Sequence, residues 1–347
     1  MVTTSYERPG VYSSYEASSV VEYATGRKQV GLVAVCESAT PNEVRTITSA
    51  SDGVKVYGEG LMSSLIGYAL QNGALAVVAI AIAEGTIEGY ESGISILDNV
   101  ESLPLIICDS TDLEVQQKIR DHVLLASEGR KERIAIFACG SDVENSAICE
   151  QANGLNCERV VLVAGKYTEE LGGLYCAAAM AGVVAKESDP ALPLNGVSLL
   201  GVPTLNGQYP DNELDLLVQG GVTPLEESLG VVSVVRGITT KSSTDGVADS
   251  TWRDLSTILI VDEVIGDMRT ALRLKFLRVK NTEQTRGAIR TQVLLELEAK
   301  KTREIIVDYD GITVASAEGD ASICLVGFAF SVAHGLNQIW LTAYVSV

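Results

Sequence analysis

Five apolar runs, each about as long as a β-strand, constrain the fold of this chain more than any other feature of its sequence. They occupy residues 30–36, 74–83, 103–109, 133–139 and 159–164. Stretches with helical character separate several of them, among them residues 61–71, 112–127 and 168–186. A strand that is apolar on both faces must be covered by helices on both faces. The alternation therefore predicts an α/β layered domain with a mostly parallel sheet.

The composition agrees with such a core and excludes disorder for the bulk of the chain. Apolar residues make up 46% of the 347 residues but aromatic residues only 5%, so Val, Ile, Leu and Ala must fill the interior. A chain of this length has room for one to three domains with a substantial core. High apolar content is the opposite of the composition of disordered segments.

Charge is distributed unevenly along the chain. The 45 acidic and 26 basic residues give a net charge of −19, which argues against binding nucleic acid or an anionic membrane through a general basic surface. Residues 1–235 carry 31 acidic and 13 basic residues, whereas residues 236–347 carry 14 and 13. Ten of the basic residues fall within positions 269–303, against three glutamates. The chain therefore has an acidic body and one basic segment.

Residues after 236 follow a different pattern, which predicts a second, α+β domain. Apolar residues between positions 258 and 276 recur every three or four residues, as in an amphipathic helix, and a second helix is expected from about 282 to 301. Strand-like segments follow at 304–309, 311–315, 322–332 and 338–347. The Ser-, Tyr- and Glu-rich residues 1–28 are expected to form an extended arm. The predicted divisions are an N-terminal arm (1–28), an α/β domain (29–235), a core domain (236–335) and a C-terminal arm strand (336–347).

Cysteine usage and the N-terminal sequence indicate synthesis in a reducing cytoplasm. The seven cysteines form no C-x-x-C pair and no metal-ligand spacing, so a disulfide framework is not expected. The first residues lack the basic and apolar regions of a signal peptide. The longest apolar run has ten residues, about half of what a membrane-spanning helix needs.

Motifs of enzymatic chemistry are missing or incomplete. Gly165-Lys166 lacks the preceding glycine of a phosphate-binding loop, and Gly58-Glu-Gly60 lacks the third glycine of a dinucleotide fingerprint. The two histidines, His122 and His334, are interpreted as ordinary structural residues. We therefore expect no catalytic, cofactor-binding or metal-binding residues. A soluble cytoplasmic α/β enzyme, hydrolase-like and with an unrecognised site, remains the alternative.

Several short segments, taken in order, resemble the sheath proteins of contractile phage tails and of R-type bacteriocins and related injection particles. The N-terminal sequence YERPGVY at 6–12 is similar to the Pro-Gly-Val-Tyr opening of that family. The other similar segments are residues 177–185, 189–197, 220–225, 236–239, 252–258 and 334–342. Their order and spacing carry the resemblance, and together they extend over essentially the whole chain. At 347 residues the chain lacks the additional outer domains of the largest phage sheaths.

The resemblance implies a structural protein without enzymatic activity. Such a protein forms stacked hexameric rings in a helical array around a rigid inner tube, and contracts from a metastable extended state to drive the tube through a cell envelope. Its implied partners are further copies of itself, the inner tube protein, and baseplate and tail terminator proteins, with neither nucleic acid nor membrane insertion. It implies a location in a virion tail or an extracellular phage-tail-like particle, assembled in the cytoplasm of the bacterial host.

The resemblance also implies that both terminal arms add strands to neighbouring subunits. The alternating apolar and polar residues at 339–347 suit this role, because β-augmentation takes affinity from backbone bonds and register from alternate side chains. Pairing of this strand inside its own domain is the other interpretation. The predicted arm residues are Val11, Tyr12, Tyr15, Ile339, Trp340, Leu341, Tyr344 and Val345.

The basic segment has two interpretations as well. Lysines and arginines on amphipathic helices usually form a solvated face. With the family resemblance, they are predicted to hold an acidic tube surface through screened, reversible charge pairs, with the acidic domain facing outward. The candidates, of which some are expected to face the tube, are Arg269, Arg273, Arg286, Arg290, Lys300, Lys301 and Arg303.

Overall fold

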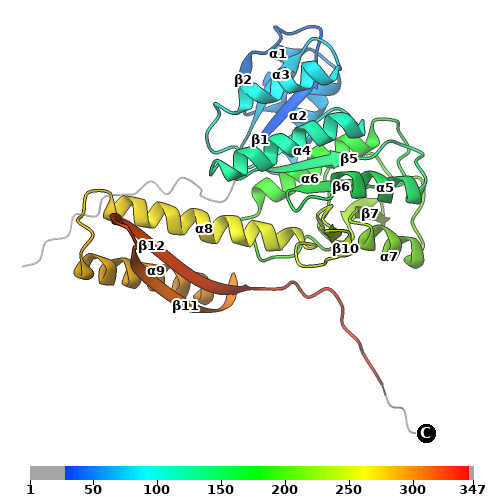
Figure 1. Ribbon diagram of the computed structural model, residues 1–347. Helices are drawn as coiled ribbons and strands as arrows, with labels where there is room; N and C mark the ends of the chain where they lie inside the picture. Colours follow the sequence, from blue (N-terminus) through cyan, green and yellow to red (C-terminus); the bar gives the residue numbers. More distant parts are fainter. Residues whose placement is uncertain (1–27, 344–347) are drawn as a thin grey trace, which may run out of the picture.

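The computed structural model describes residues 28–343. Within that range the chain forms a layered α/β part and a smaller part made of two long helices and a β-hairpin (Figure 1). All but the last residue of the expected N-terminal arm lies outside the described residues. The arm residues Val11, Tyr12, Tyr15, Tyr344 and Val345 lie outside them too.

An eight-stranded sheet with the order β2-β3-β1-β4-β5-β6-β7-β8 forms the centre of the α/β part. The six inner strands run parallel, and the two outer strands, β2 and β8, are antiparallel to their neighbours. The mostly parallel sheet that the apolar runs predicted is therefore confirmed. The strands are β1 (Gln29–Val35), β2 (Val44–Ile47), β3 (Ala76–Ile82), β4 (Leu105–Cys108), β5 (Ile134–Ala138), β6 (Val160–Ala164), β7 (Thr223–Ser228) and β8 (Val231–Val234).

Helices cover this sheet in two groups. Helices α2 and α6 pack on each other, while α3, α4, α5 and α7 contact one another in that order. A Cβ atom on Gly182 of α6 would lie 2.3 Å from the carbonyl oxygen of Ala69 in α2, so these two helices cross with their backbones in contact. The helices are α1 (Ala50–Tyr57), α2 (Leu61–Gln71), α3 (Ile87–Leu97), α4 (Leu113–Glu128), α5 (Asn145–Leu155), α6 (Gly172–Lys186) and α7 (Asp211–Gln219).

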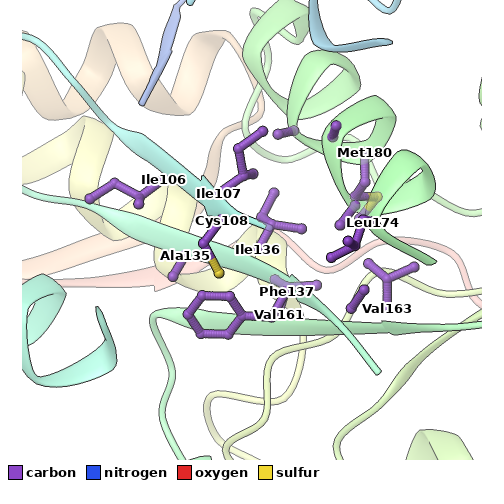
Figure 2. Packing of buried hydrophobic residues seen from close by; sticks show 14 of the residues in the cluster. Ile106, Ile107, Cys108, Ala135, Ile136, Phe137, Val161, Val163, Leu174 and Met180 are labelled. Carbon is purple, nitrogen blue, oxygen red and sulfur yellow. The ribbon is translucent and has the colours of Figure 1, made fainter. Parts of the chain in front are cut away.

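The inner strands are buried on both faces. Every residue of β3, β4, β5 and β6 is buried. Figure 2 shows Leu174 and Met180 of α6 on the side of the sheet toward which Ile136 points, while the ring of Phe137 lies on the other side, as alternation along a strand requires. This double burial is what made the inner strands recognisable in the sequence.

The second part is a helical hairpin packed on a β-hairpin. The helices are α8 (Leu255–Phe276) and α9 (Glu283–Thr302), and the strands are β11 (Ile306–Ala317) and β12 (Asp320–Val332). Thr282 caps α9, its hydroxyl accepting from the backbone N–H of Thr285 at 3.2 Å. The expectation of separate strands at 304–309 and 311–315 is wrong. They form one strand, whose register shifts between Asp310 and Thr313, where Gly311 has a φ of +66°.

The two hydrophobic cores separate inside α8. Leu255 and Ile258 pack in the core of the α/β part, whereas Ile260 belongs to the second core. Residues before α8 also pack on the first part: the N–H of Thr240 donates to the carbonyl of Val160 at 2.8 Å. A two-stranded ribbon of β9 (Ser243–Thr244) and β10 (Val247–Ala248) lies in this stretch. The second core thus begins well after the boundary expected near residue 236.

Candidate assembly surface

One face of the β11–β12 hairpin packs against the hydrophobic core of its own domain. Side chains at alternate positions of β12, including Val326, Phe328 and Phe330, are half-buried against the core of α8 and α9. The intervening Ile323 and Leu325 point away and are 47% and 56% exposed. Thr313 and Ala315 lie on the same outward side, so these four residues form an uncharged patch next to the turn, which itself carries the exposed Glu318 and Asp320.

Neither long edge of this hairpin has a strand partner within residues 28–343, although Asn281 donates to the carbonyls of Ala321 and Ile323, and Arg290 to that of Ile312. There β11 pairs with β12 and with no other strand, and β12 pairs with β11 alone. An open edge presents a row of backbone N–H and C=O groups that can pair with a further strand. Two-stranded sheets of this kind are marginal alone and gain stability from additional strands.

The chain after β12 is first anchored to the rest of the molecule by hydrogen bonds and then extends away from it. The N–H of Ala333 donates to Ile305 O at 3.2 Å, and Nδ2 of Asn195 donates to Oδ1 of Asn337 at 2.8 Å. Beyond this anchor the chain runs away from the body (Figure 1). There the side chains of Ile339, Trp340 and Leu341 are 80%, 88% and 90% exposed.

This segment was predicted to be a strand, and residues 338–343 form none in the single chain. The sequence pattern reports the alternation of side chains, but a strand also needs a partner for its backbone. Within the described residues the segment has no such partner, so the interpretation of pairing inside its own domain finds no support there.

Most of the basic residues predicted to face a tube are engaged inside the chain. Arg269 pairs with Glu132 of the α/β part at 2.7 Å. Four further ion pairs involve this group: Lys300 with Glu263 (2.6 Å) and Asp267 (2.5 Å), Arg303 with Glu263 (3.3 Å), and Lys301 with Asp308 (2.8 Å). The prediction fails for Lys300, because only 4% of the residue is exposed and its ammonium group is directed into the protein.

Arg286 and Arg290 form hydrogen bonds to their own domain. Arg286 donates to Oδ1 of Asn281 at 3.0 Å, and Arg290 donates to the carbonyl of Ile312. Among the seven candidates, Arg273 alone has neither an ion pair nor a side-chain hydrogen bond to any described residue. Arg273 therefore keeps its charge available for a partner.

Arg273 belongs to a mixed basic and apolar surface at the end of the helical hairpin, which we call the tip patch. It consists of the exposed residues Arg273, Leu274, Leu277, Arg278, Val279 and Lys280. Leu274 and Leu277 are 79% and 74% exposed. Arg278 and Lys280 were noted in the basic segment but not selected. The sequence signal that could have identified the tip patch is the run at 273–280, in which basic and apolar residues mix across the end of a helix.

Groups typical of catalysis or redox chemistry are scarce in the part of the chain that the structure describes. No cluster of three or more His, Cys, Asp or Glu side chains is placed to hold a metal ion among residues 28–343. All seven cysteines have free thiols, and burial raises the pKa of Cys108, Cys139 and Cys176 to about 12. These three thiols therefore stay protonated and act as small apolar groups. None of the described helices is long and apolar enough to span a membrane.

Comparison with protein families gives two matches. The phage tail sheath protein central domain matches residues 86–240, and the phage tail sheath C-terminal domain matches residues 247–346. Together they cover well over half of the chain. No curated protein sequence matches it.

Solved structures show the same fold at low sequence identity. A sheath tail protein from Desulfitobacterium hafniense aligns with a TM-score of 0.69 and 12% identity, over 93% of this chain and 100% of that one. A sheath tail protein from Listeria innocua gives a TM-score of 0.71 and 13% identity, over 88% and 92%. The helical sheath of the anti-feeding prophage in its contracted state gives 0.70 and 14%, over 99% and 100%.

Fold and sequence thus define a structural component of a phage tail or a phage-tail-like particle. The chain belongs to the phage tail sheath family. The family resemblance drawn from the ordered short segments is confirmed.

Proposed function

We propose that this chain polymerises into a contractile sheath around the rigid inner tube of a phage tail or phage-tail-like particle. In this proposal hexameric rings stack into a helical array, and contraction from a metastable extended state drives the tube through a cell envelope. The observation that carries the proposal is the β11–β12 hairpin, which has no further strand partner in the described chain, together with residues 338–343, which leave the body without forming a strand there.

Strand addition between subunits follows from these two features. An incoming strand satisfies the open N–H and C=O groups of the hairpin edge, and alternate side chains set its register. The residues at 339–341 supply such an alternation, with Ile339 and Leu341 on one side and Trp340 on the other. With two edges that lack a strand partner in the described chain, the hairpin can accept a C-terminal strand and an N-terminal strand from different neighbours.

The charge distribution supports a specific orientation of the subunit relative to the inner tube. In the proposed sheath the tip patch faces the inner tube, and the acidic α/β part faces solvent. Partly exposed charge pairs are weakened by salt and exchange readily, which suits a contact that must be released. Baseplate and terminator proteins would meet the ends of the same array.

The alternative of a soluble α/β enzyme rests on no specific observation. Family membership favours a structural role. The sheath function is therefore the only one that we propose.

Electron microscopy of the purified full-length chain tests the proposed function directly. We expect long hollow cylinders with a helical repeat after concentration, because each subunit offers both a strand and an edge that accepts one. Sedimentation of the same sample should show a broad, fast fraction. Small discrete particles at every concentration tested would contradict the proposal.

Reversing the charge of Arg273 and Arg278 should weaken binding to the inner tube protein at low salt. The physical reason is that like charges then face an acidic tube surface, and the effect should shrink near 0.5 M salt, where the Debye length is only about 4 Å. Co-sedimentation of sheath and tube protein at both salt concentrations measures this.

The double variant Arg45→Glu/Lys55→Glu provides the matched control for that experiment, because Arg45 and Lys55 are exposed basic residues of the α/β part. It should leave co-sedimentation unchanged. Equal loss of tube binding in the control and in the tip variant, or no loss in either, would remove the tip patch from the tube contact.

A further inference from the structure

His122 and Arg133 form a close contact at the edge of the α/β core. Nη1 of Arg133 lies 2.7 Å from Nε2 of His122 in α4. Nη2 of Arg133 donates to the carbonyls of Leu97 (2.6 Å) and Val100 (3.1 Å). Arg133 is 1% exposed and directly precedes β5. Its guanidinium thus ties α4 and β5 to the end of α3 and to the loop at residues 98–104.

This geometry requires a neutral histidine. A guanidinium donates hydrogen bonds and accepts none, so Nε2 of His122 must be the acceptor. The ring proton is then on Nδ1, which faces Oδ1 of Asp98 at 3.6 Å. Protonation of Nε2 would remove the acceptor and place two cations 2.7 Å apart.

The carboxylate of Asp98 is the alternative acceptor for this donor, but its Oδ1 lies 3.8 Å from Nη1 of Arg133, beyond hydrogen-bond distance. Nε of Arg133 is already buried without a hydrogen-bond partner among the described residues. Losing His122 as an acceptor would leave a second donor of the same guanidinium unsatisfied, and each such buried group costs free energy. The contact is therefore either made with neutral His122 or broken.

The charged groups around His122 favour the neutral ring on balance. Burial of the ring lowers the pKa of His122; the carboxylate of Asp98 opposes this, and the charge of Arg133 adds to it. Asp98 lies at the end of α3, its side chain is 56% exposed, and it is 3.8 Å from Arg133, so water screens its effect. Lys131, from the segment before β5, donates to the carbonyl of Asp98.

We propose that the His122–Arg133 contact is a proton-sensitive lock that holds residues 98–104 against the α/β part near neutral pH and releases them in acid. Protonated His122 turns toward Asp98, and repulsion between the two cations displaces the guanidinium, whose Nη2 holds the carbonyls of Leu97 and Val100. This proposal goes beyond the sheath function and does not depend on it.

The sign of the pH effect follows from the lowered pKa. The unfolded chain takes up a proton on this histidine near pH 6.5, before the folded chain does. The stabilisation is therefore complete above that pH and declines as the pH falls below it. The chain contains only two histidines, so a substitution of His122 separates its proton uptake from that of the other titratable groups.

The test compares His122→Gln with the wild type in urea unfolding at about pH 7.5 and pH 5.5. The amide oxygen of glutamine can accept from Arg133 and does not titrate. We expect the unfolding midpoint of the wild type to fall at the lower pH, and that of His122→Gln to fall by less than half as much. His334→Gln, on the exposed tail, should behave as the wild type. An equal fall in His122→Gln and in the wild type would overturn the proposal.

Amide hydrogen exchange reports the loop itself. After correction for intrinsic rates, the wild type and His334→Gln should lose protection at residues 98–104 severalfold at the lower pH, while strand β3 keeps its protection. Unchanged protection of the loop at both pH values would overturn the proposal even if His122→Gln does not fold.

Discussion

Replacing Arg159 with methionine is expected to lower the free energy of unfolding by about 3–5 kcal/mol near pH 7. Arg159 directly precedes β6, and its guanidinium binds Asp262 of α8 in bidentate fashion, with both N–O distances at 2.8 Å. The two side chains are 12% and 18% exposed. Removing the arginine leaves a buried carboxylate without its partner at the junction of the two parts of the molecule.

The loss should depend on pH. Burial raises the pKa of Asp262 even with Arg159 in place, and Arg159 is the main group that opposes this rise. In Arg159→Met the pKa of Asp262 rises further, so the folded variant retains a proton that the unfolded chain releases. Stability of the variant therefore falls as pH increases above the ordinary range of an aspartate, and the defect should be larger at pH 7 than at pH 5.

A double-mutant cycle with Asp262→Leu separates the pair from its surroundings. Replacing both partners by apolar residues should recover most of the loss, since no buried charge then lacks a partner. Lys55→Met, which removes one member of an exposed pair, should leave the urea midpoint unchanged. An additive double mutant, as unstable as the sum of the two single mutants, would contradict this account of the junction.

The inner strands of the sheet could be predicted because their signal is local. A strand such as β3, buried along its whole length, must be apolar at every position, and this is visible in a single sequence. The strand β2 was missed because three of its four residues are exposed, so it needs no apolar run. In β11 the bulge at Gly311 interrupts the alternation, which divided one strand into two in the sequence.

The contacts of the basic residues at 269–303 could not be predicted in the same way. These residues were correctly placed on amphipathic helices, but their partners are set by tertiary contacts. Glu132 lies 137 positions before Arg269, and no local pattern links the two. Lys300 is buried by the packing of α9 on α8, where Glu263 and Asp267 meet its ammonium group. Arg273 and the tip patch have no ion pair with any residue of the described range 28–343, because they lie beyond these acidic residues.

Deleting residues 339–347 should abolish long polymers while leaving the subunit folded. The large apolar side chains of this segment that the structure describes, Ile339, Trp340 and Leu341, are 80–90% exposed and contribute little apolar burial to their own chain. We therefore expect the thermal midpoint of the monomer to change by no more than about 1 °C. If the segment supplies a strand to a neighbour, its loss removes a row of intersubunit backbone hydrogen bonds, and electron microscopy should show only small particles.

Three further variants distinguish strand pairing from other roles of the same segment. A Gly/Ser sequence of equal length keeps the chain length but removes the alternating side chains, and it should polymerise as poorly as the deletion. Leu341→Pro removes one backbone donor and favours a conformation unsuited to the middle of a sheet, so a single substitution in an exposed segment should impair assembly without affecting the monomer. Leu341→Val keeps the donor and suits a strand, so it should assemble as the wild type does. Normal helical cylinders from the deletion variant would show that the β11–β12 hairpin is joined to its neighbours in some other way.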